Sequence, residues 1–139
     1  MRVFVPATMP LLARLHAQGT LPVTARVAVT DAFRSEHPEV SDAEELEYLA
    51  MTEAARESIE LIAADPEAAH RRVVIAADDP GDELRLDQIA SVHVDDDGAV
   101  EAIQHAADII RDGGECPDEV DEFELMWFAP QELSVVLTT

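Results

Sequence analysis

Five short runs of the chain have the apolar content of β-strands. Val3, Phe4 and Val5 follow one another without a polar residue, which is typical of a buried strand. Over residues 23–29 apolar and polar residues alternate, so this segment predicts a strand with one buried face. The predicted strands cover residues 2–6, 23–29, 71–77, 89–94 and 123–129.

Three helices are predicted between these strands, at residues 8–19, 41–64 and 96–113. A short further helix is expected to start at Thr30. The longest helix begins with Ser41 and Glu44, whose spacing is that of a capping box. Asp96 or Asp97 is expected to cap the last helix, because a short acidic side chain can accept hydrogen bonds from the first free N–H groups.

The order of these elements is β-α-β-α-β-β-α-β, which predicts one α+β domain over residues 1–139. The connection at residues 78–88 is too short for a helical crossover, so the two strands that flank it are expected to pair antiparallel. We therefore expect a two-layer sandwich of ferredoxin-like type, with a mixed, mainly antiparallel sheet and helices on one face. Residues 133–137 fit a strand or a helix equally well.

Acidic residues are distributed unevenly along the chain. All 30 aspartates and glutamates follow position 30, against nine arginines and no lysine, and the formal net charge is −21. Such a surface repels DNA, RNA and anionic lipid, so we expect no direct nucleic-acid binding and no membrane binding. It attracts basic proteins and cations. Lysine codons are A-rich, so the absence of lysine indicates a G+C-rich genome.

The cysteine count and the apolar opening of the chain bear on its compartment. Cys116 is the only cysteine, so an internal disulfide is impossible, which fits a reducing cytoplasm. The acidic residues around Cys116 are expected to raise the pKa of its thiol rather than to activate it. Pro6 and Pro10 interrupt the apolar opening, no cleavage site follows, and no stretch approaches a membrane span. We therefore expect a cytoplasmic protein.

Six segments of the chain resemble those of a family of small uncharacterised actinobacterial proteins. They are MRVFVPAT at 1–8, EELEY at 44–48, AARESIELIAADP at 54–66, RRVVIAADDP at 71–80, VHVDDD at 92–97 and ELMWFAPQEL at 124–133. The resemblance covers nearly the whole chain and implies an intracellular protein of a G+C-rich bacterium. It implies no activity, substrate or catalytic residue.

Glu47 is the most unusual residue of the helix predicted at residues 41–64. It lies near the centre of the apolar arc and precedes Tyr48, the only tyrosine. A carboxylate that loses its water there would have a raised pKa, which suits acid–base catalysis. The interpretation we prefer is that Glu47 reaches solvent from the first turns of the helix and interacts favourably with the helix dipole.

Ser91, His93 and Asp95 share one face of the strand predicted at residues 89–94, and they are the residue types of a hydrolase triad. Neighbours on one strand face are about 7 Å apart, which is long for a Ser–His–Asp relay. No GxSxG turn accompanies them. We interpret the three as a polar strand face, and keep Glu47 and His93 as the catalytic candidates.

Two groups of aspartates, Asp78 with Asp79 and Asp95 with Asp97, each follow a predicted strand. Acidic pairs at the carboxyl ends of parallel strands are a common way to bind Mg²⁺. If the two strands are antiparallel, however, the groups lie at opposite ends. Turn and helix-capping roles already account for these residues, so we expect no metal site and no cofactor.

The last predicted strand is apolar on both faces. Trp127 shares one face with Phe123 and Leu125, and Met126 and Phe128 occupy the other. Such a strand is either covered on both sides or presents one side to a partner. We expect core positions, with an interface at Trp127, Met126 and Phe128 as the alternative.

These observations favour a non-catalytic, cytoplasmic binding or regulatory domain that contacts another protein or a second copy of itself. Two alternatives stay open. One is an acidic inhibitor that mimics nucleic acid and occupies a basic protein through acidic loops at residues 78–87, 95–97 and 115–124. The other is a metal-dependent hydrolase or phosphotransferase that uses the four aspartates named above.

Overall fold

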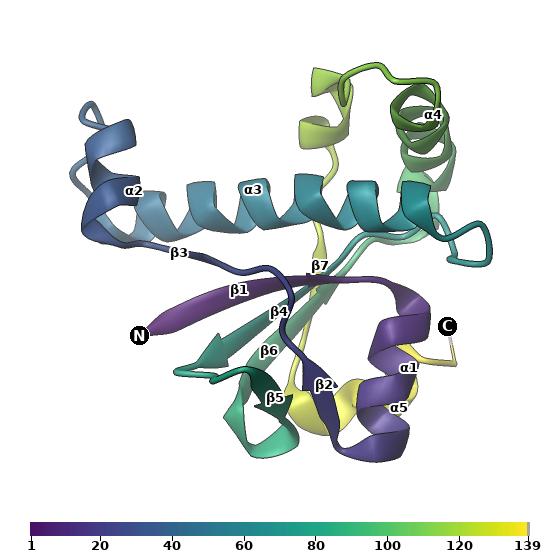
Figure 1. Ribbon diagram of the computed structural model, residues 1–139, viewed down its shortest axis with the longest axis horizontal. Helices are drawn as coiled ribbons and strands as arrows, with labels where there is room; N and C mark the ends of the chain where they lie inside the picture. Colours follow the sequence, from purple (N-terminus) through teal and green to yellow (C-terminus); the bar gives the residue numbers. More distant parts are fainter. Residues whose placement is uncertain (139) are drawn as a thin grey trace.

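The computed structural model describes residues 1–138, which form an α+β fold built on an antiparallel sheet of five strands. The strand order across this sheet is β3-β1-β4-β6-β7 (Figure 1). Its strands are β1 (Arg2–Ala7), β3 (Val27–Ala28), β4 (Val73–Asp78), β6 (Ile89–Val94) and β7 (Met126–Phe128). A second sheet contains β2 (Thr20–Pro22) and β5 (Glu83–Arg85), which are also antiparallel.

Five α-helices and four short 3-10 helices lie between or after the strands within residues 1–138. The α-helices are α1 (Met9–Gln18), α2 (Asp31–Glu36), α3 (Ala43–Ala64), α4 (Val100–Arg111) and α5 (Leu133–Val136). The 3-10 helices are η1 (Leu86–Gln88), η2 (Asp97–Ala99), η3 (Asp118–Glu122) and η4 (Pro130–Glu132). No helix within residues 1–138 combines the length and the apolar character that crossing a bilayer requires.

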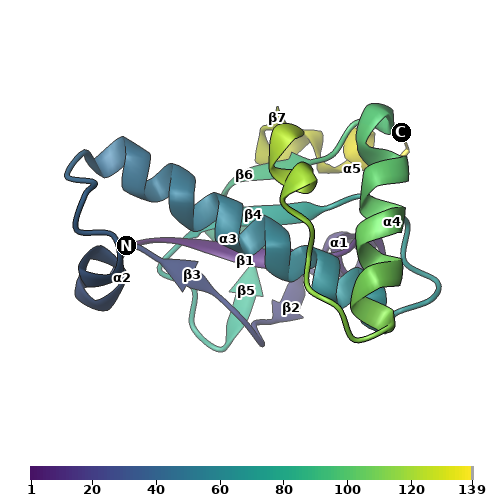
Figure 2. The ribbon, with the colours of Figure 1, turned by 90° about the horizontal axis from the view of Figure 1, so that it is seen from above.

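Helices cover both faces of the large sheet, so the expected two-layer sandwich with helices on one face is wrong. On one face, Val73 and Ile75 of β4 pack with side chains of α1 and α5. On the other face, Val74 and Ala76 pack with side chains of α2 and α3. Figure 1 shows α3 above the sheet and α1 and α5 below it, and the view from above in Figure 2 shows α3 crossing the strands. A central strand buried on both faces has a continuous apolar sequence, as β4 does.

The ferredoxin-like expectation is also wrong, because that arrangement places parallel strands side by side. Every strand pair within residues 1–138 is antiparallel. The expected antiparallel pairing of β4 with β6 is confirmed, with Val73 opposite Val94. The opening of the chain forms β1, α1, β2 and then β3, and β3 returns beside β1 in the antiparallel direction.

Two predicted strands differ from those in the structure. Of the strand expected at residues 23–29 only residues 27–28 form a strand, β3, because β2 ends at Pro22 before the expected start. The segment between β2 and β3 is fixed by other bonds. The guanidinium of Arg26 donates to the carbonyl oxygens of Pro80 and Gly81. The backbone N–H of Val23 donates to the carbonyl oxygen of Asp82. The last strand is shorter than expected, because Phe123 packs beside α3 and α4 instead of joining the sheet.

The helices follow the predicted bounds closely, with one change at a cap. The side chain that caps α3 is Asp42, not Ser41, and it accepts a hydrogen bond from the N–H of Glu44. Asp96 caps η2, the single turn that leads into α4. The undecided segment at residues 133–137 forms α5.

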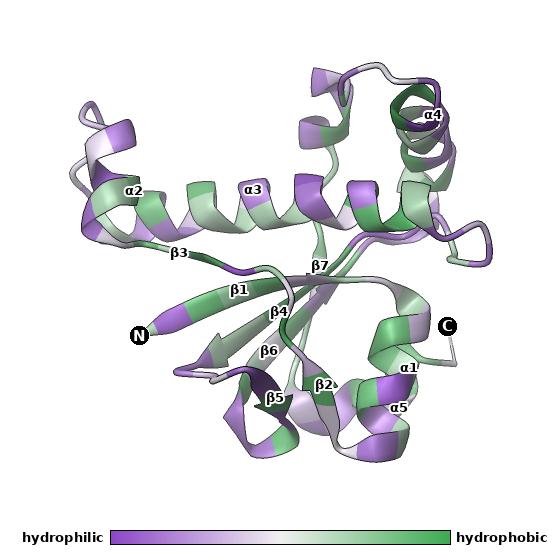
Figure 3. Cartoon of the chain, viewed as in Figure 1, coloured by the Kyte–Doolittle hydropathy of each residue, from purple (hydrophilic) through white to green (hydrophobic). Residues whose placement is uncertain are grey.

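In Figure 3 most of β1 is coloured hydrophobic, whereas the loop after β4 is hydrophilic.

One buried hydroxyl joins α3 to the sheet. Ser58 is fully buried, and its hydroxyl donates to the carbonyl oxygen of Ala7 at 2.7 Å. The hydroxyl oxygen of Ser58 in turn accepts a hydrogen bond from the N–H of Val73 at 3.0 Å. Because Ala7 and Val73 are partners in the β1–β4 register, Ser58 occupies the last step of that ladder. This bond fixes α3 over the sheet and so sets the position of the groove described next.

Candidate functional site

A groove lies between α3 and the edge of the large sheet formed by β6 and β7. It consists of two hollows of about 210 and 290 Å³ that share Tyr48, Met51 and His93 in their walls. We call it the Tyr48–Trp127 groove. Its other lining residues are Arg2, Phe4, Glu44, Glu47, Thr52, Ala55, Arg72, Ala76, Ser91, Asp121, Phe123, Glu124, Leu125 and Trp127. The groove thus brings together three candidates of the sequence analysis, Glu47, His93 and Trp127.

The two large aromatic residues of the groove are exposed. Trp127, the only tryptophan, is 62 % exposed, and Tyr48, the only tyrosine, is 57 % exposed. The expectation that Trp127 lies in the core is wrong, because β7 is the last strand of the sheet and this side chain remains largely exposed at that edge. Met126 and Phe128 are half-buried, and Phe128 packs on the core below the sheet.

Trp127 lies directly opposite His93 in the β6–β7 register. The N–H of Asp95 donates to the carbonyl of Arg72, so the odd-numbered residues of β6 direct their backbone groups toward β4. The backbone N–H and C=O of His93 therefore bond to β4, not to β7. His93 and Trp127 thus form a non-hydrogen-bonded pair, the type of strand pair in which opposite side chains approach most closely. The backbone N–H and C=O of Trp127 consequently point outward, away from β6.

His93 forms the floor of the groove together with Ser91. The Ser91 hydroxyl is 2.8 Å from Nε2 of His93, and both residues are buried. The expectation that they are too far apart is wrong, because side chains on one strand face lean toward each other across the distance that separates their Cα atoms. Burial, and then the positive charge of Arg2, lower the pKa of His93, so the imidazole is neutral at pH 7 and the contact is a neutral hydrogen bond.

Asp95 does not complete a triad with Ser91 and His93. Its carboxylate is fully buried and forms a two-point ion pair with Arg72, from Oδ2 to Nε and from Oδ1 to Nη2, each at 2.8 Å. Oδ2 also accepts the backbone N–H of Arg72. With both oxygens committed to Arg72, Asp95 cannot orient the imidazole of His93.

Arg72 and Arg56 hold the far wall of the groove in place. Arg72 also donates to the carbonyl oxygens of Val120 and Phe123, which fastens the segment around η3 to the sheet. Arg56 of α3 pairs with Asp118 and Asp121 of η3. Sequence analysis missed both arginines. The apolar strand that follows Arg72 was the available signal, since a charged residue at the start of a buried strand needs a buried partner.

The carboxylates of the groove outnumber its available cations. Arg2 is bonded to Asp78, and Arg72 to Asp95. Glu44, Glu47 and Glu124 line the groove without a side-chain partner among residues 1–138. Glu47 is half-buried and points into the groove instead of freely into solvent. The groove therefore combines exposed aromatic rings with negative charge.

The aspartates considered for metal binding do not meet. Asp78 pairs with Arg2, and Asp79 pairs with the amino group of Met1, at one end of β4. Asp95 lies opposite residue 72 at the other end, and Asp97 pairs with Arg71. Within residues 1–138 no group of three His, Cys, Asp or Glu side chains is arranged to bind a metal ion. The antiparallel pairing of β4 with β6 accounts for this separation.

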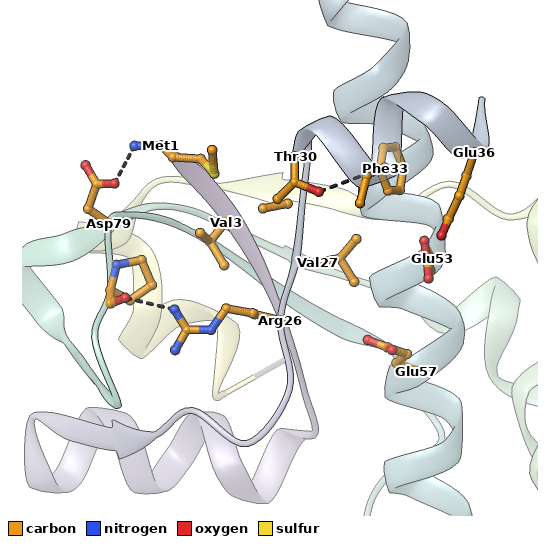
Figure 4. Close-up of a pocket in the computed structure, with 13 residues that line it drawn as sticks. Met1, Val3, Arg26, Val27, Thr30, Phe33, Glu36, Glu53, Glu57 and Asp79 are labelled. Atoms are coloured by element: carbon orange, nitrogen blue, oxygen red, sulfur yellow. Dashed lines mark hydrogen bonds and ion pairs between the residues drawn. The ribbon is translucent and has the colours of Figure 1, made fainter. Parts of the chain in front are cut away.

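Another hollow, of about 520 Å³, is lined by residues of β1, β3, α2 and α3 and by the loop after β4. Figure 4 shows the carboxyl groups of Glu36 and Glu53 close together there, with Glu57 one turn further along α3. One oxygen of Glu57 is buried and has no hydrogen-bond partner among the described residues. Burial, Glu53 and Glu60 raise the pKa of Glu57. The hollow also has an apolar wall that includes Phe33.

Cys116 has the raised thiol pKa that the sequence predicts, although the main cause is burial, with a smaller contribution from the charge of Asp121. Arg56 acts in the opposite direction and lowers the pKa. The thiol packs beside α3 and α4. A thiol with a raised pKa is a poor nucleophile at neutral pH, so Cys116 lacks the activation that a catalytic cysteine needs.

Comparison with protein families matches residues 1–137 to the model of a family of unknown function, DUF6912. The chain belongs to this family. The match covers the segments on which the sequence resemblance rests, and the family's description assigns no activity. Comparison with curated proteins and with solved structures found no match.

Proposed function

We propose that this chain is a non-catalytic binding domain that contacts another protein through the Tyr48–Trp127 groove. The observation that carries the proposal is that the only tryptophan and the only tyrosine are both exposed in one groove. Tryptophan and tyrosine are the residue types most enriched among those that dominate binding energy in protein interfaces. Leaving both in water without a partner costs hydrophobic free energy that docking would recover.

The charge of the chain selects the class of partner. A net charge of −21 repels nucleic acid and anionic membranes, and it also repels a second copy of the same chain. A different, basic protein is the partner that this surface favours. Mimicry of nucleic acid has less support, because the acidic loops at residues 78–82 and 95–97 lie at opposite ends of the β4–β6 pair (Figure 1).

The compartment and origin of the domain are part of the proposal. A single, half-buried cysteine suits a reducing cytoplasm. The absence of lysine suits a G+C-rich, actinobacterial genome. A cytoplasmic extract of such a bacterium is therefore the source in which to search for the partner.

Photo-crosslinking from within the groove tests the proposal. A photoreactive phenylalanine analogue at Tyr48 should form one discrete adduct in the native host, and Trp127→Ala should reduce it. The matched control carries the analogue at Val135, another exposed apolar residue, which lies on α5 away from the groove. Equal adducts from both positions, or none from position 48, would contradict the proposal.

One observation favours a second candidate function, hydrolysis by a Ser91–His93 pair. The 2.8 Å contact and the neutral imidazole suit a general base that activates a hydroxyl. Against this, Ser91 lies within a strand instead of at the sharp turn where free N–H groups would stabilise an oxyanion. Labelling of Ser91 by a fluorophosphonate, lost in His93→Ala, would move the assignment to a hydrolase.

A further inference from the structure

We infer that the partner enters the groove as an extended segment bearing an arginine, whose guanidinium lies between Tyr48 and Trp127 and faces Glu44 and Glu47. This inference rests on the proposed function and specifies its ligand. Three features of the groove support it: its unpaired carboxylates, its exposed aromatic faces, and the outward backbone groups of Trp127.

The carboxylates call for a cation. Glu44 and Glu47 lie one turn apart on α3 and line the same hollow, and neither has a side-chain partner among the described residues. The nearby cations cannot neutralise them, because Arg2 is bonded to Asp78 and Arg72 to Asp95. A guanidinium provides several N–H donors in one plane and can bond to two carboxylates at once.

The aromatic rings favour arginine over a simple metal cation or a lysine. A guanidinium is planar, weakly hydrated and stacks on aromatic faces, whereas an ammonium is compact and strongly hydrated. Cation–π contact of a guanidinium with tryptophan or tyrosine is favourable, and it is stronger where water is excluded. The groove places Trp127 and Tyr48 on the same hollow as Glu47, so one side chain can meet all three.

The edge of the sheet provides the backbone contact. Trp127 directs its N–H and C=O outward, and no strand among residues 1–138 pairs with the outer side of β7. An added segment would form a hydrogen-bonded pair with Trp127, and the side chain of its paired residue would then project over the same face as Trp127, into the groove. Two residues on, the N–H of Ala129 is already bonded to the side chain of Glu132, so the added segment cannot extend its backbone pairing to that amide.

Trp127 provides the readout for a direct test, because it is the only tryptophan and its fluorescence reports on the groove alone. The probe is a short acetylated and amidated peptide in which valine and threonine flank a central arginine. We expect a saturable change in fluorescence. Replacing the arginine by citrulline, which has the same shape without the charge, should weaken binding about tenfold. Methylating the backbone nitrogen of the arginine should weaken it as well, because the bond to the carbonyl of Trp127 is lost.

Two protein variants with matched charge separate the groove from the general acidity of the surface. Glu47→Gln should weaken binding of the arginine peptide about tenfold, whereas Glu45→Gln, an exposed neighbour outside the groove, should leave it unchanged. Tyr48→Ala should also weaken it. Circular dichroism of each variant establishes that the fold is intact.

Equal binding of the arginine and citrulline peptides, or equal effects of Glu47→Gln and Glu45→Gln, would overturn the inference. Absence of saturable binding would also overturn it. The proposed function is tested separately, since a partner could still crosslink at position 48 through an apolar segment. Absence of any specific adduct from position 48 in the native host would reject the proposed function, and the inference that rests on it would fail as well.

Discussion

Arg72 and Asp95 form a buried, two-point ion pair between the start of β4 and the end of β6. The same guanidinium reaches across to the carbonyls of Val120 and Phe123, so it joins the sheet to the segment that precedes β7. The position of the groove wall therefore depends on one side chain whose charge is neutralised within the fold.

Asp95→Ala should destabilise the protein by about 3–5 kcal/mol, because it leaves the Arg72 guanidinium buried without its carboxylate. Urea denaturation followed by circular dichroism measures the loss. The matched control is Asp87→Ala, which removes the exposed partner of Arg85 and should cost about 0–1 kcal/mol. Equal costs for the two variants would mean that the buried pair adds nothing to stability.

Ser58→Ala should cost about 1–3 kcal/mol, because it leaves the N–H of Val73 and the carbonyl of Ala7 buried without a partner. Hydrogen exchange of the Val73 amide should accelerate more than that of amides in the middle of β4. Ser35→Ala removes an exposed hydroxyl bond within α2 and serves as the control. If Ser58→Ala costs no more than Ser35→Ala, the hydroxyl does not fix α3 to the sheet.

Glu57→Gln should stabilise the protein at pH 7. Burial, Glu53 and Glu60 raise the pKa of Glu57 in the folded state, so the ionised form is disfavoured there at neutral pH. The gain should be below about 1 kcal/mol, because solvent screens a partly exposed carboxylate. It should disappear as the pH falls below about 4.3, where glutamate is protonated in the unfolded chain also.

Thermal or urea denaturation of Glu57→Gln and wild type across this pH range measures the difference. The control is Glu67→Gln, which removes one negative charge from an exposed position after α3, where the carboxylate is not buried. A gain of equal size in Glu67→Gln would assign the effect to net charge instead of burial.

His93 should titrate below the usual value near 6.5, because burial and Arg2 lower its pKa. Proton NMR of the imidazole across pH measures this, and Arg2→Gln should raise the pKa only in part, since burial is the larger cause. A lowered pKa of a base means that stability is complete above the unfolded-state pKa and declines as the pH falls toward the folded-state pKa. The stability of wild type relative to His93→Gln should therefore decline as the pH falls below about 6.5.

The long periodic elements could be predicted from the sequence, whereas the short ones could not. The alternation in residues 89–94 predicts β6 with its observed bounds, and the apolar arc at 41–64 predicts α3 to within two residues. The strands β2 and β5 are three residues each, and their pairing depends on contacts between distant segments that no local pattern reveals.

The candidate site could be predicted only in part. The sequence singles out Glu47, His93 and Trp127 individually. A two-sided apolar strand does not reveal that β7 ends the sheet, so the pattern places Trp127 in the core. The Ser91–His93 bond was rejected on Cα spacing, which ignores the lean of side chains along a strand. Arg72 and Asp95 are far apart in sequence, and nothing local marks them as partners.

The hydrogen bond from Ala129 to Glu132 limits how far any segment can extend along β7. Exposed strand edges invite copies of a protein to stack on one another without limit. Here the pairing edge ends two residues beyond Trp127, because the N–H of Ala129 already donates to the carboxylate of Glu132. A partner segment can therefore pair with β7 over a short stretch only. The side chain of Glu132 thereby also disfavours the edge-to-edge stacking of copies into fibres.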